Sequence, residues 1–249
     1  MVSSPILLDF QSSTPCFKEV VEEMSSYWTE NFANPSSKAN LSGLYASASL
    51  EVSRNRIQEN LNLSNKKIIF TSGATESNNL ALLGFARNFL QKTGRYGNII
   101  TLKTEHKAVL EPIRQLKKEG FSITELNPES DGLILEENLV NALRNDTFLI
   151  SIMLANNEIG VIQPIEKIFK ICQKNNIKLH TDAAQCLGYV PMRNFNSLAN
   201  MITLSSHKIY GPKGIGLLII DEDIQLNPLI YGGGQEFGYR SGTIPLPLI

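Results

Sequence analysis

The stretch Phe148-Leu149-Ile150-Ser151-Ile152-Met153-Leu154 is an almost uninterrupted apolar run. Such a run is typical of a β-strand that is buried on both faces of a sheet. Shorter runs of the same kind recur along the chain, and segments with apolar residues at helical spacing lie between them. The expected strands are residues 67–71, 98–102, 148–154, 177–182 and 201–204, and the expected helices are residues 41–61, 75–92, 107–119 and 165–175.

The alternation of strands and helices predicts parallel strands joined by crossover helices. We therefore predict an α/β fold with a mostly parallel, open sheet and helices on both faces. The chain has 249 residues, of which 42% are hydrophobic. This is enough for a sizeable core, in one large domain or two modest ones.

Composition excludes several classes of partner and location. The formal net charge of -1 argues against nucleic-acid binding, which needs a clustered basic surface. Residues 1–9 lack the features of a signal peptide, and no apolar run reaches membrane-spanning length. The cysteines Cys16, Cys172 and Cys186 are odd in number and scattered without metal-ligand spacing. We expect a reducing, cytoplasmic location.

A lysine follows the expected strand at residues 201–204, in the stretch Ser205-Ser206-His207-Lys208-Ile209-Tyr210-Gly211-Pro212-Lys213-Gly214. Burial at the end of a core strand lowers the pKa of an amine and frees its lone pair. Lys208 is therefore a candidate for condensing with the aldehyde group of a cofactor.

The segment Thr71-Ser72-Gly73-Ala74-Thr75-Glu76-Ser77-Asn78-Asn79 joins a strand to a helix. Small residues and a helix start suit a bound phosphate, with Thr75 as a further donor. An ordinary capped helix start explains the same residues. The segment matches neither the dinucleotide-binding glycine pattern nor a P-loop.

Three interpretations remain open for His180-Thr181-Asp182-Ala183-Ala184-Gln185. His180 and Asp182 share one face of a strand because side chains alternate. In the first interpretation, Asp182 pairs with a pyridine nitrogen and Gln185 bonds the phenolate oxygen of the same ring. In the second, His180 and Asp182 bind a metal. In the third, they are a buried polar pair.

Three further segments that come after expected strands contain candidate site residues, and each has more than one interpretation. His106, in Thr104-Glu105-His106-Lys107, is placed to stack on a ring or move a proton, or simply to cap a helix. The segment Asn156-Asn157-Glu158-Ile159-Gly160 suits either a ligand site at the strand ends or a turn. The glycine-rich residues 232–243 are either a flexible connection or a second anion contact through Arg240 and Thr243.

Together these segments are more specific than any one of them. A phosphate-type turn, a histidine, an asparagine pair, an acid and a lysine each follow their own expected strand. In a parallel sheet they would all line the carboxyl edge. That arrangement suits a ring cofactor with a phosphate tail.

The chain resembles the NifS-like cysteine desulfurases, within the class V aminotransferase group of pyridoxal-phosphate enzymes. The resemblance runs from Leu8-Asp9 to Arg240-Ser241-Gly242-Thr243. It implies the large, cofactor-binding domain of a fold type I pyridoxal-phosphate enzyme. The motifs that carry it, in the family's order, are TSGATESNN, KTEHKAV, SIMLANNEIGV, HTDAAQ and SSHKIYGPKG.

The resemblance also implies a role for each matching residue. Lys208 would form the Schiff base and move the substrate's α-proton, and His106 would stack on the ring and take part in proton transfer. Asp182 would pair with the pyridine nitrogen, Gln185 with the phenolate oxygen, and Asn157 would lie beside the cofactor. The phosphate would be held by Ala74, Thr75, Ser205 and His207, with Thr243 reaching the phosphate of a partner subunit.

The activity that this resemblance implies is conversion of L-cysteine to L-alanine, with the sulfur left as an enzyme-bound persulfide. A sulfur-acceptor or scaffold protein of iron–sulfur cluster assembly would take the sulfur, and the enzyme would be a homodimer. The family's nucleophilic cysteine and its carboxylate-binding arginine lie beyond residue 249. Cys186 directly follows Gln185, but we expect a small buried hydrophobic residue there.

We therefore expect residues 16–249 to be the large pyridoxal-phosphate domain and residues 1–15 to pack with a small C-terminal domain that is largely absent. A strand near residues 7–9 would belong to that segment. We expect weak cofactor binding without completed desulfuration. The first alternative is a non-catalytic fragment or subunit that only dimerises with a complete desulfurase. The second is a metal hydrolase using His106, His180 and Asp182, which would leave Lys208 unexplained.

Overall fold

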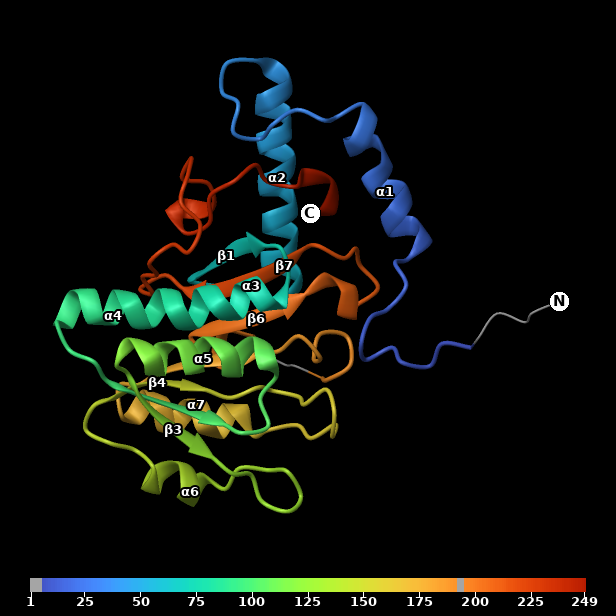
Figure 1. The fold of residues 1–249 in the computed structure, drawn as a ribbon. Helices are drawn as coiled ribbons and strands as arrows, with labels where there is room; N and C mark the ends of the chain where they lie inside the picture. The colour runs from blue at the N-terminus through green and yellow to red at the C-terminus, as the bar shows by residue number, and fades with distance from the viewer. Residues whose placement is uncertain (1–5, 192–194) are drawn as a thin grey trace.

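The structure is a computed structural model that describes residues 6–191 and 195–249. Its centre is a seven-stranded sheet with the strand order β1-β7-β6-β5-β4-β2-β3 (Figure 1). Only β7 runs antiparallel to its neighbours, so the predicted mostly parallel, open sheet is confirmed. The strands are β1 (Lys66–Thr71), β2 (Asn98–Leu102), β3 (Ser122–Leu126), β4 (Thr147–Ser151), β5 (Lys178–Asp182), β6 (Met201–Ser205) and β7 (Gly216–Asp221).

Helices cover both faces of this sheet (Figure 1). The expected helix at 75–92 consists of α3, a π-helical turn at Leu80–Gly84, and α4, and the other three expected helices lie within one residue of their predicted bounds. The α-helices are α1 (Lys18–Thr29), α2 (Leu41–Asn60), α3 (Ala74–Asn79), α4 (Phe85–Thr93), α5 (Lys107–Glu119), α6 (Glu136–Asn141) and α7 (Ile165–Lys174).

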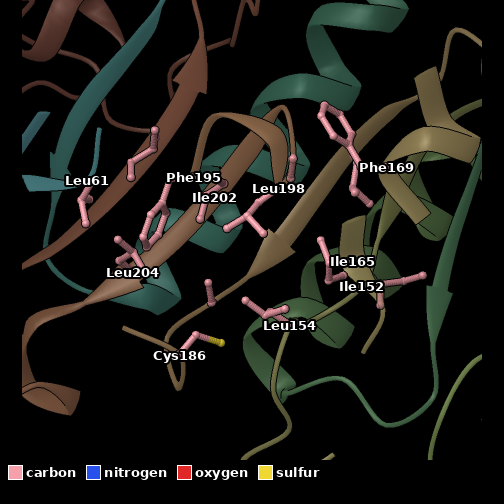
Figure 2. Close-up of a cluster of buried hydrophobic side chains, with 14 of the residues drawn as sticks. Leu61, Ile152, Leu154, Ile165, Phe169, Cys186, Phe195, Leu198, Ile202 and Leu204 are labelled. Carbon is pink, nitrogen blue, oxygen red and sulfur yellow. The ribbon is translucent and has the colours of Figure 1, made fainter. Parts of the chain in front are cut away.

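Two hydrophobic cores form because alternate side chains of each strand point to opposite faces. Ile69 belongs to the core on one face, together with residues of α4 and α5, whereas Ile68 and Phe70 belong to the core on the other, together with residues of α2 and α7. Figure 2 shows part of the second core, where Cys186 lies among leucine, isoleucine and phenylalanine side chains. Burial raises the pKa of the Cys172 and Cys186 thiols to about 12, so both behave as small hydrophobic residues.

Two expected strands differ from the structure. The run at 148–154 forms a strand only as far as Ser151. Beyond it the N–H groups of Ile152 and Leu154 still donate to β5, whereas the N–H of Met153 donates to the Glu105 carboxylate (2.8 Å). Residues 6–9 form no strand, and Ile6, Leu7 and Leu8 are exposed. The first five residues of the expected segment 1–15 lie outside the described residues, and its division from residues 16–249 stays a prediction.

Among the α-helices and β-strands of the described residues, four were not anticipated from the sequence, namely α1, β3, α6 and the antiparallel β7. Among the helices that the structure describes, none combines the length and apolar character that a bilayer crossing requires.

Candidate functional site

A cavity of about 510 Å³ lies at the carboxyl ends of the strands. Its volume is within the range of small-molecule sites. The loops after β1, β2, β4, β5 and β6 all contribute to it, as an open parallel sheet requires. Nine of the residues predicted from the sequence line it, namely Ala74, Thr75, His106, Asn157, Asp182, Gln185, Ser205, His207 and Lys208.

The phosphate-type turn lies at one end of the cavity. Gly73 has a φ of +145°, a conformation that L side chains rarely adopt, and a Cβ there would meet open space. On the far side of the turn, a Cβ at Gly216 would lie 2.6 Å from the Cα of Gly73. This close approach presses the turn against the start of β7. Ser205 ends β6 nearby, and its buried Oγ has no hydrogen-bond partner among the described residues.

Lys208 lies in the same cavity, and its Nζ donates to the backbone carbonyls of Gln11 (2.5 Å) and Ser12 (3.0 Å). The amide of Gln185 donates to the same Gln11 carbonyl (2.9 Å). Burial lowers the pKa of the Lys208 amine, and the carboxylates of Asp182 and Asp9 only partly offset this. A larger fraction of the amine is therefore uncharged and nucleophilic than for an exposed lysine.

Residues 11–14, which we call the strap, lie against the cavity: Ser12 and Ser13 line it, and Gln11 and Ser12 accept from Lys208. The strap is fastened by Thr14, whose N–H and Oγ both donate to the His207 carbonyl (2.9 and 3.0 Å). The Thr14 Oγ also accepts from the Tyr210 N–H (2.8 Å). These bonds hold Ser12 and Ser13, which line the cavity, opposite Lys208.

Asp182 ends β5 and is buried, with both carboxylate oxygens hydrogen-bonded. Oδ1 accepts from the N–H of Ala184 (3.0 Å), and Oδ2 accepts from the side-chain amide of Asn78 (2.7 Å). Burial raises the pKa of Asp182, and these hydrogen bonds and the nearby His106 and Lys208 oppose that rise. The carboxylate therefore faces the cavity with its orientation fixed from two sides.

His180 does not line the cavity, although it shares a strand with Asp182. Its Nδ1 and Nε2 are hydrogen-bonded to the hydroxyls of Ser151 (2.8 Å) and Thr203 (3.2 Å). Complete burial lowers the pKa of His180 to about 3, so the ring is neutral. In the described part of the chain, no three His, Cys, Asp or Glu side chains are grouped to hold a metal. His180 thus fits the buried polar interpretation, and the metal alternative lacks a ligand set.

His106 both caps a helix and lines the cavity. Its Nδ1 accepts from the N–H of Ala108 at the start of α5 (3.0 Å), which leaves Nε2 as the free nitrogen. The preceding Glu105 is buried and accepts from the N–H of Met153, and Asn156 donates to the Thr104 carbonyl (2.8 Å). These two bonds tie the loop that carries His106 to the loop that carries Asn157.

The glycine-rich residues 232–243 are placed differently from the expected second anion contact. The guanidinium of Arg240 donates to the Glu76 carboxylate (2.9 Å), so Arg240 is already paired. Burial opposes ionisation of Glu76, but the bonds from Arg240 and Ser72 outweigh it and lower the pKa. Thr243 is exposed and does not line this cavity. Its expected contact with a partner subunit's phosphate stays a prediction.

Sequence reasoning missed the strap, Asn78 and Glu105. Ser12, Ser13 and Thr14 carry no signal for a site, since small hydroxyl residues before a proline are common in turns. Asn78 lies within a quoted motif, but nothing in the sequence indicates that it reaches a residue 104 positions away. Only the packing of α3 against the strand ends reveals this contact.

Comparison with known proteins gives a consistent result. Residues 6–245 match the family model described as aminotransferase class-V. The chain is 47% identical over 246 residues to cysteine desulfurase IscS of Pasteurella multocida, covering 97% of this chain and 60% of that protein. It is 47% identical over 247 residues to a mitochondrial cysteine desulfurase of Eremothecium gossypii, covering 98% of this chain and 50% of that protein.

Solved structures are similar over nearly the whole chain. A NifS-like protein superposes with a TM-score of 0.93 at 39% identity, covering 98% of this chain and 67% of that one. A structure titled SspA in complex with cysteine gives a TM-score of 0.92 at 41% identity, covering 98% of this chain and 70% of that one. The chain thus spans about 60% of the length of the bacterial relatives that it matches.

Proposed function

The chain belongs to the aminotransferase class-V family, and on that premise we propose that it is the cofactor-binding part of a pyridoxal-phosphate-dependent cysteine desulfurase. Its similarity to cysteine desulfurases and to NifS-like structures supports this. The observation that carries the proposal is the cavity itself. Lys208 and Asp182 both line it, at the ends of neighbouring strands β6 and β5.

The residues present fit pyridoxal phosphate. The unpartnered, buried Oγ of Ser205 needs an acceptor or donor from a ligand, and a phosphate beside the Gly73 turn would supply one. The Asp182 carboxylate suits a protonated ring nitrogen, and the Lys208 amine suits an aldehyde. When bound, pyridoxal phosphate supplies that aldehyde and a ring that withdraws electrons from the substrate's α-carbon.

The chain's own residues would then act as follows. Ala74, Thr75, Ser205 and His207 hold the phosphate, and Gln185 donates to the ring's phenolate oxygen. His106, whose Nδ1 is held by the N–H of Ala108 and whose Nε2 is free, would stack on the cofactor ring, and Asn157 would lie beside it. Lys208 provides the condensing amine and afterwards moves a proton at the substrate's α-carbon, a task that its lowered pKa favours.

The sulfur-accepting step needs a thiolate close to the substrate. Of the cysteines in the described residues, Cys172 and Cys186 are buried with raised pKa values, and none lines the cavity. We propose that Cys16, Cys172 and Cys186 do not accept the sulfur of L-cysteine. Completed desulfuration would need a nucleophile from elsewhere.

The first experiment adds pyridoxal phosphate to the purified chain and follows visible absorption. We expect a new band that borohydride reduction converts to a stable adduct, located on Lys208 by peptide mass spectrometry. Lys208→Ala should abolish both signals. Lys103→Ala removes an exposed lysine outside the cavity and should leave them unchanged. An adduct that persists in Lys208→Ala would refute the proposal.

The second experiment adds L-cysteine to the loaded chain. We expect its absorption to change as the amino acid displaces the Lys208 amine, with no persulfide detected on the chain by mass spectrometry. A persulfide on Cys16, Cys172 or Cys186 would refute the proposed incapacity.

We further propose that the chain dimerises, as a homodimer or with a complete desulfurase. Helix α1 buries none of its residues and stands apart from the sheet (Figure 1). Apolar side chains on α1, on the start of α2 and on the segment between them are exposed, namely Val21, Trp28, Phe32, Leu41, Leu44 and Tyr45. Sedimentation of the chain alone and with a full-length relative would distinguish the two forms, and a monomer in both would refute dimerisation.

A sulfur-acceptor protein and a cytoplasmic location also stay predictions. The curated relatives include a mitochondrial protein as well as bacterial ones, so similarity does not decide the compartment.

A further inference from the structure

We infer that Asn78 is a positioning residue, which sets the orientation and charge of Asp182 and so the chain's grip on the cofactor ring. The inference rests on the proposed function. Asn78 lies in α3, is completely buried and does not line the cavity. Its Nδ2 donates to Oδ2 of Asp182 at 2.7 Å. It acts on a ligand only through that carboxylate.

The two hydrogen bonds to Asp182 have different consequences. Ala184 follows Asp182 by only two residues, so its N–H holds Oδ1 only relative to the end of β5. Asn78 comes from a different element and fixes the rotation of the carboxylate relative to the rest of the site. Among the bonds of the described residues, it is the only side-chain donor to Asp182.

Asn78 also favours the charged form of Asp182. The carboxyl is buried, which raises its pKa, and the buried Glu105 lies close enough to interact with it. His106 and Lys208 act in the opposite direction, and Cys186 is a further neighbour with a high pKa. A hydrogen bond from a neutral amide stabilises the carboxylate without adding a charge. Such a carboxylate is what a protonated ring nitrogen requires.

The position of Asn78 joins the two ends of the cofactor site. The same short helix begins with Ala74 and Thr75, which line the phosphate end of the cavity. Strands β1 and β5 are separated in the sheet by β7 and β6, so no ladder bond joins them. The contact between Asn78 and Asp182 is therefore a direct link between the helix that begins at the phosphate turn and the ring acid, in addition to the indirect link through the sheet.

A purely structural role explains Asn78 poorly. Its Oδ1 is buried and has no hydrogen-bond partner among the described residues. An unpaired buried carbonyl is unfavourable, and an apolar side chain of similar volume would avoid that cost. Among the described residues, the bond to Asp182 is thus the only hydrogen bond of the Asn78 side chain, so contact with that carboxylate is the role that the structure assigns to it.

The test compares pyridoxal phosphate with its 1-deaza analogue, in which a C–H replaces the ring nitrogen. Binding to wild type, Asn78→Leu and Asn78→Ala is measured by fluorescence titration, with thermal unfolding to confirm folding. Loss of one hydrogen bond to a charged group predicts about tenfold weaker binding of pyridoxal phosphate to both variants. Binding of the deaza analogue, which has no nitrogen for Asp182 to pair with, should change by less than about twofold.

Asn79→Ala is the matched control. Asn79 is the next residue, and within the described part of the chain its amide donates only to the Thr75 carbonyl of its own helix (2.8 Å). It should bind both compounds as wild type does. Asn78→Leu retains the branching of the side chain at Cγ and leaves no cavity, so it keeps the test open if Asn78→Ala fails to fold.

Two outcomes would overturn the inference. Equal weakening of both compounds would mean that Asn78 only supports the fold, and unchanged binding of both would mean that Asp182 is positioned without it. Neither outcome touches the proposed function, because that is tested separately by adduct formation on Lys208 in wild type and its loss in Lys208→Ala.

Discussion

The two ends of the sheet differ in how completely their buried polar side chains are hydrogen-bonded. At the amino ends of the parallel strands, Lys66 donates to the Ala199 carbonyl (2.8 Å) and pairs with Asp221. Asn200 accepts from the N–H of Leu179 (2.8 Å) and donates to Asp221 (2.7 Å). The side chains of this cluster are buried or partly buried, and their polar groups all have hydrogen-bond partners.

A second cluster at the amino ends has the same character. The amide of Asn98 donates to the Thr124 hydroxyl (2.9 Å), and the Thr147 hydroxyl donates to the Asn98 carbonyl (2.9 Å). The other end contrasts with both clusters. Among the described residues, the buried side-chain atoms without partners all lie in or beyond the carboxyl halves of the strands or in α3, namely Asn78 Oδ1, Thr101 Oγ1, Glu105 Oε2, Thr181 Oγ1 and Ser205 Oγ.

This difference separates stability from function. A buried polar atom without a partner costs about 1 to 3 kcal/mol, whereas a satisfied one costs little. The amino ends therefore hold the sheet together, and the carboxyl ends carry a cost that a bound ligand can offset. The comparison predicts that substitutions at the two ends will have opposite effects on stability and on cofactor binding.

The largest expected effect is a loss of stability at low pH. It depends on His180, a buried residue whose ring nitrogens are both hydrogen-bonded. Folding holds the pKa of His180 at about 3, below its unfolded value of 6.5, because burial disfavours the charged ring. The contribution of His180 to the free energy of unfolding is therefore fully present above pH 6.5 and is lost as the pH falls toward 3. The full difference is on the order of 5 kcal/mol at about 1.4 kcal/mol per pH unit.

The measurement is urea unfolding of wild type and His180→Gln between pH 4 and 7. Burial raises the pKa values of Glu105 and Asp182, so they favour folding at low pH in both proteins and cancel in the difference. The free energy of unfolding should fall more steeply with acid in wild type than in His180→Gln. Equal slopes, or a His180 ring that titrates near pH 6.5 by NMR, would contradict the prediction.

The second effect is expected at Lys66, in the satisfied cluster at the amino ends. Lys66→Met keeps an unbranched side chain. It leaves the Ala199 carbonyl and Oδ1 of Asp221 without the donor that Lys66 supplies. We expect a loss of about 3 kcal/mol in the free energy of unfolding, since removing one partner of a buried ion pair costs about 3 to 5 kcal/mol. Asp221 is partly exposed and keeps its bond from Asn200, which favours the lower value.

Cofactor affinity of folded Lys66→Met should stay within about twofold of wild type, because the substitution lies at the opposite end of the sheet. Chemical unfolding and fluorescence titration measure the two quantities separately. If Lys66→Met were as stable as wild type but bound the cofactor weakly, the assignment of the amino ends to stability and the carboxyl ends to cofactor binding would be wrong.

The strand pattern explains why so much of the sheet was predictable. Apolar runs such as residues 98–102 and 201–204 are buried on both faces, and few other structures tolerate them. Strand β3 was missed because it lies at the edge of the sheet, where its residues are mostly half-buried and the run Ser122–Leu126 is mixed. Strand β7 was missed because no short crossover helix marks it.

The site was predictable where a side chain follows its own strand. Asp182 and Lys208 satisfy that rule, so the topology alone brings them to one cavity. The strap and Asn78 do not, since each reaches the site through contacts about 100 or more positions away in the chain. Local patterns carry no information about such contacts, because they depend on how finished elements pack.

The smallest expected effect distinguishes two of the unpartnered hydroxyls. Ser205 lines the cavity, whereas Thr101 lies inside β2 and does not. Thr101→Val keeps the shape and removes an unsatisfied hydroxyl, so we expect stability to rise by about 1 kcal/mol with unchanged cofactor affinity. Ser205→Ala should also leave stability unchanged or slightly higher, but it should weaken pyridoxal phosphate about tenfold through the lost bond to the phosphate.

Unfolding of the cofactor-free chains and titration of each with pyridoxal phosphate give four numbers from two variants. If Thr101→Val is destabilising, a partner for that hydroxyl exists and the contrast between the two ends is weaker than the structure indicates. If Ser205→Ala binds as wild type does, the open hydroxyl at the carboxyl end does not serve the phosphate. The contrast is supported only if Thr101→Val is more stable than wild type and Ser205→Ala binds pyridoxal phosphate weakly. In that case the unpartnered hydroxyl of Thr101 only lowers stability, whereas that of Ser205 serves the ligand.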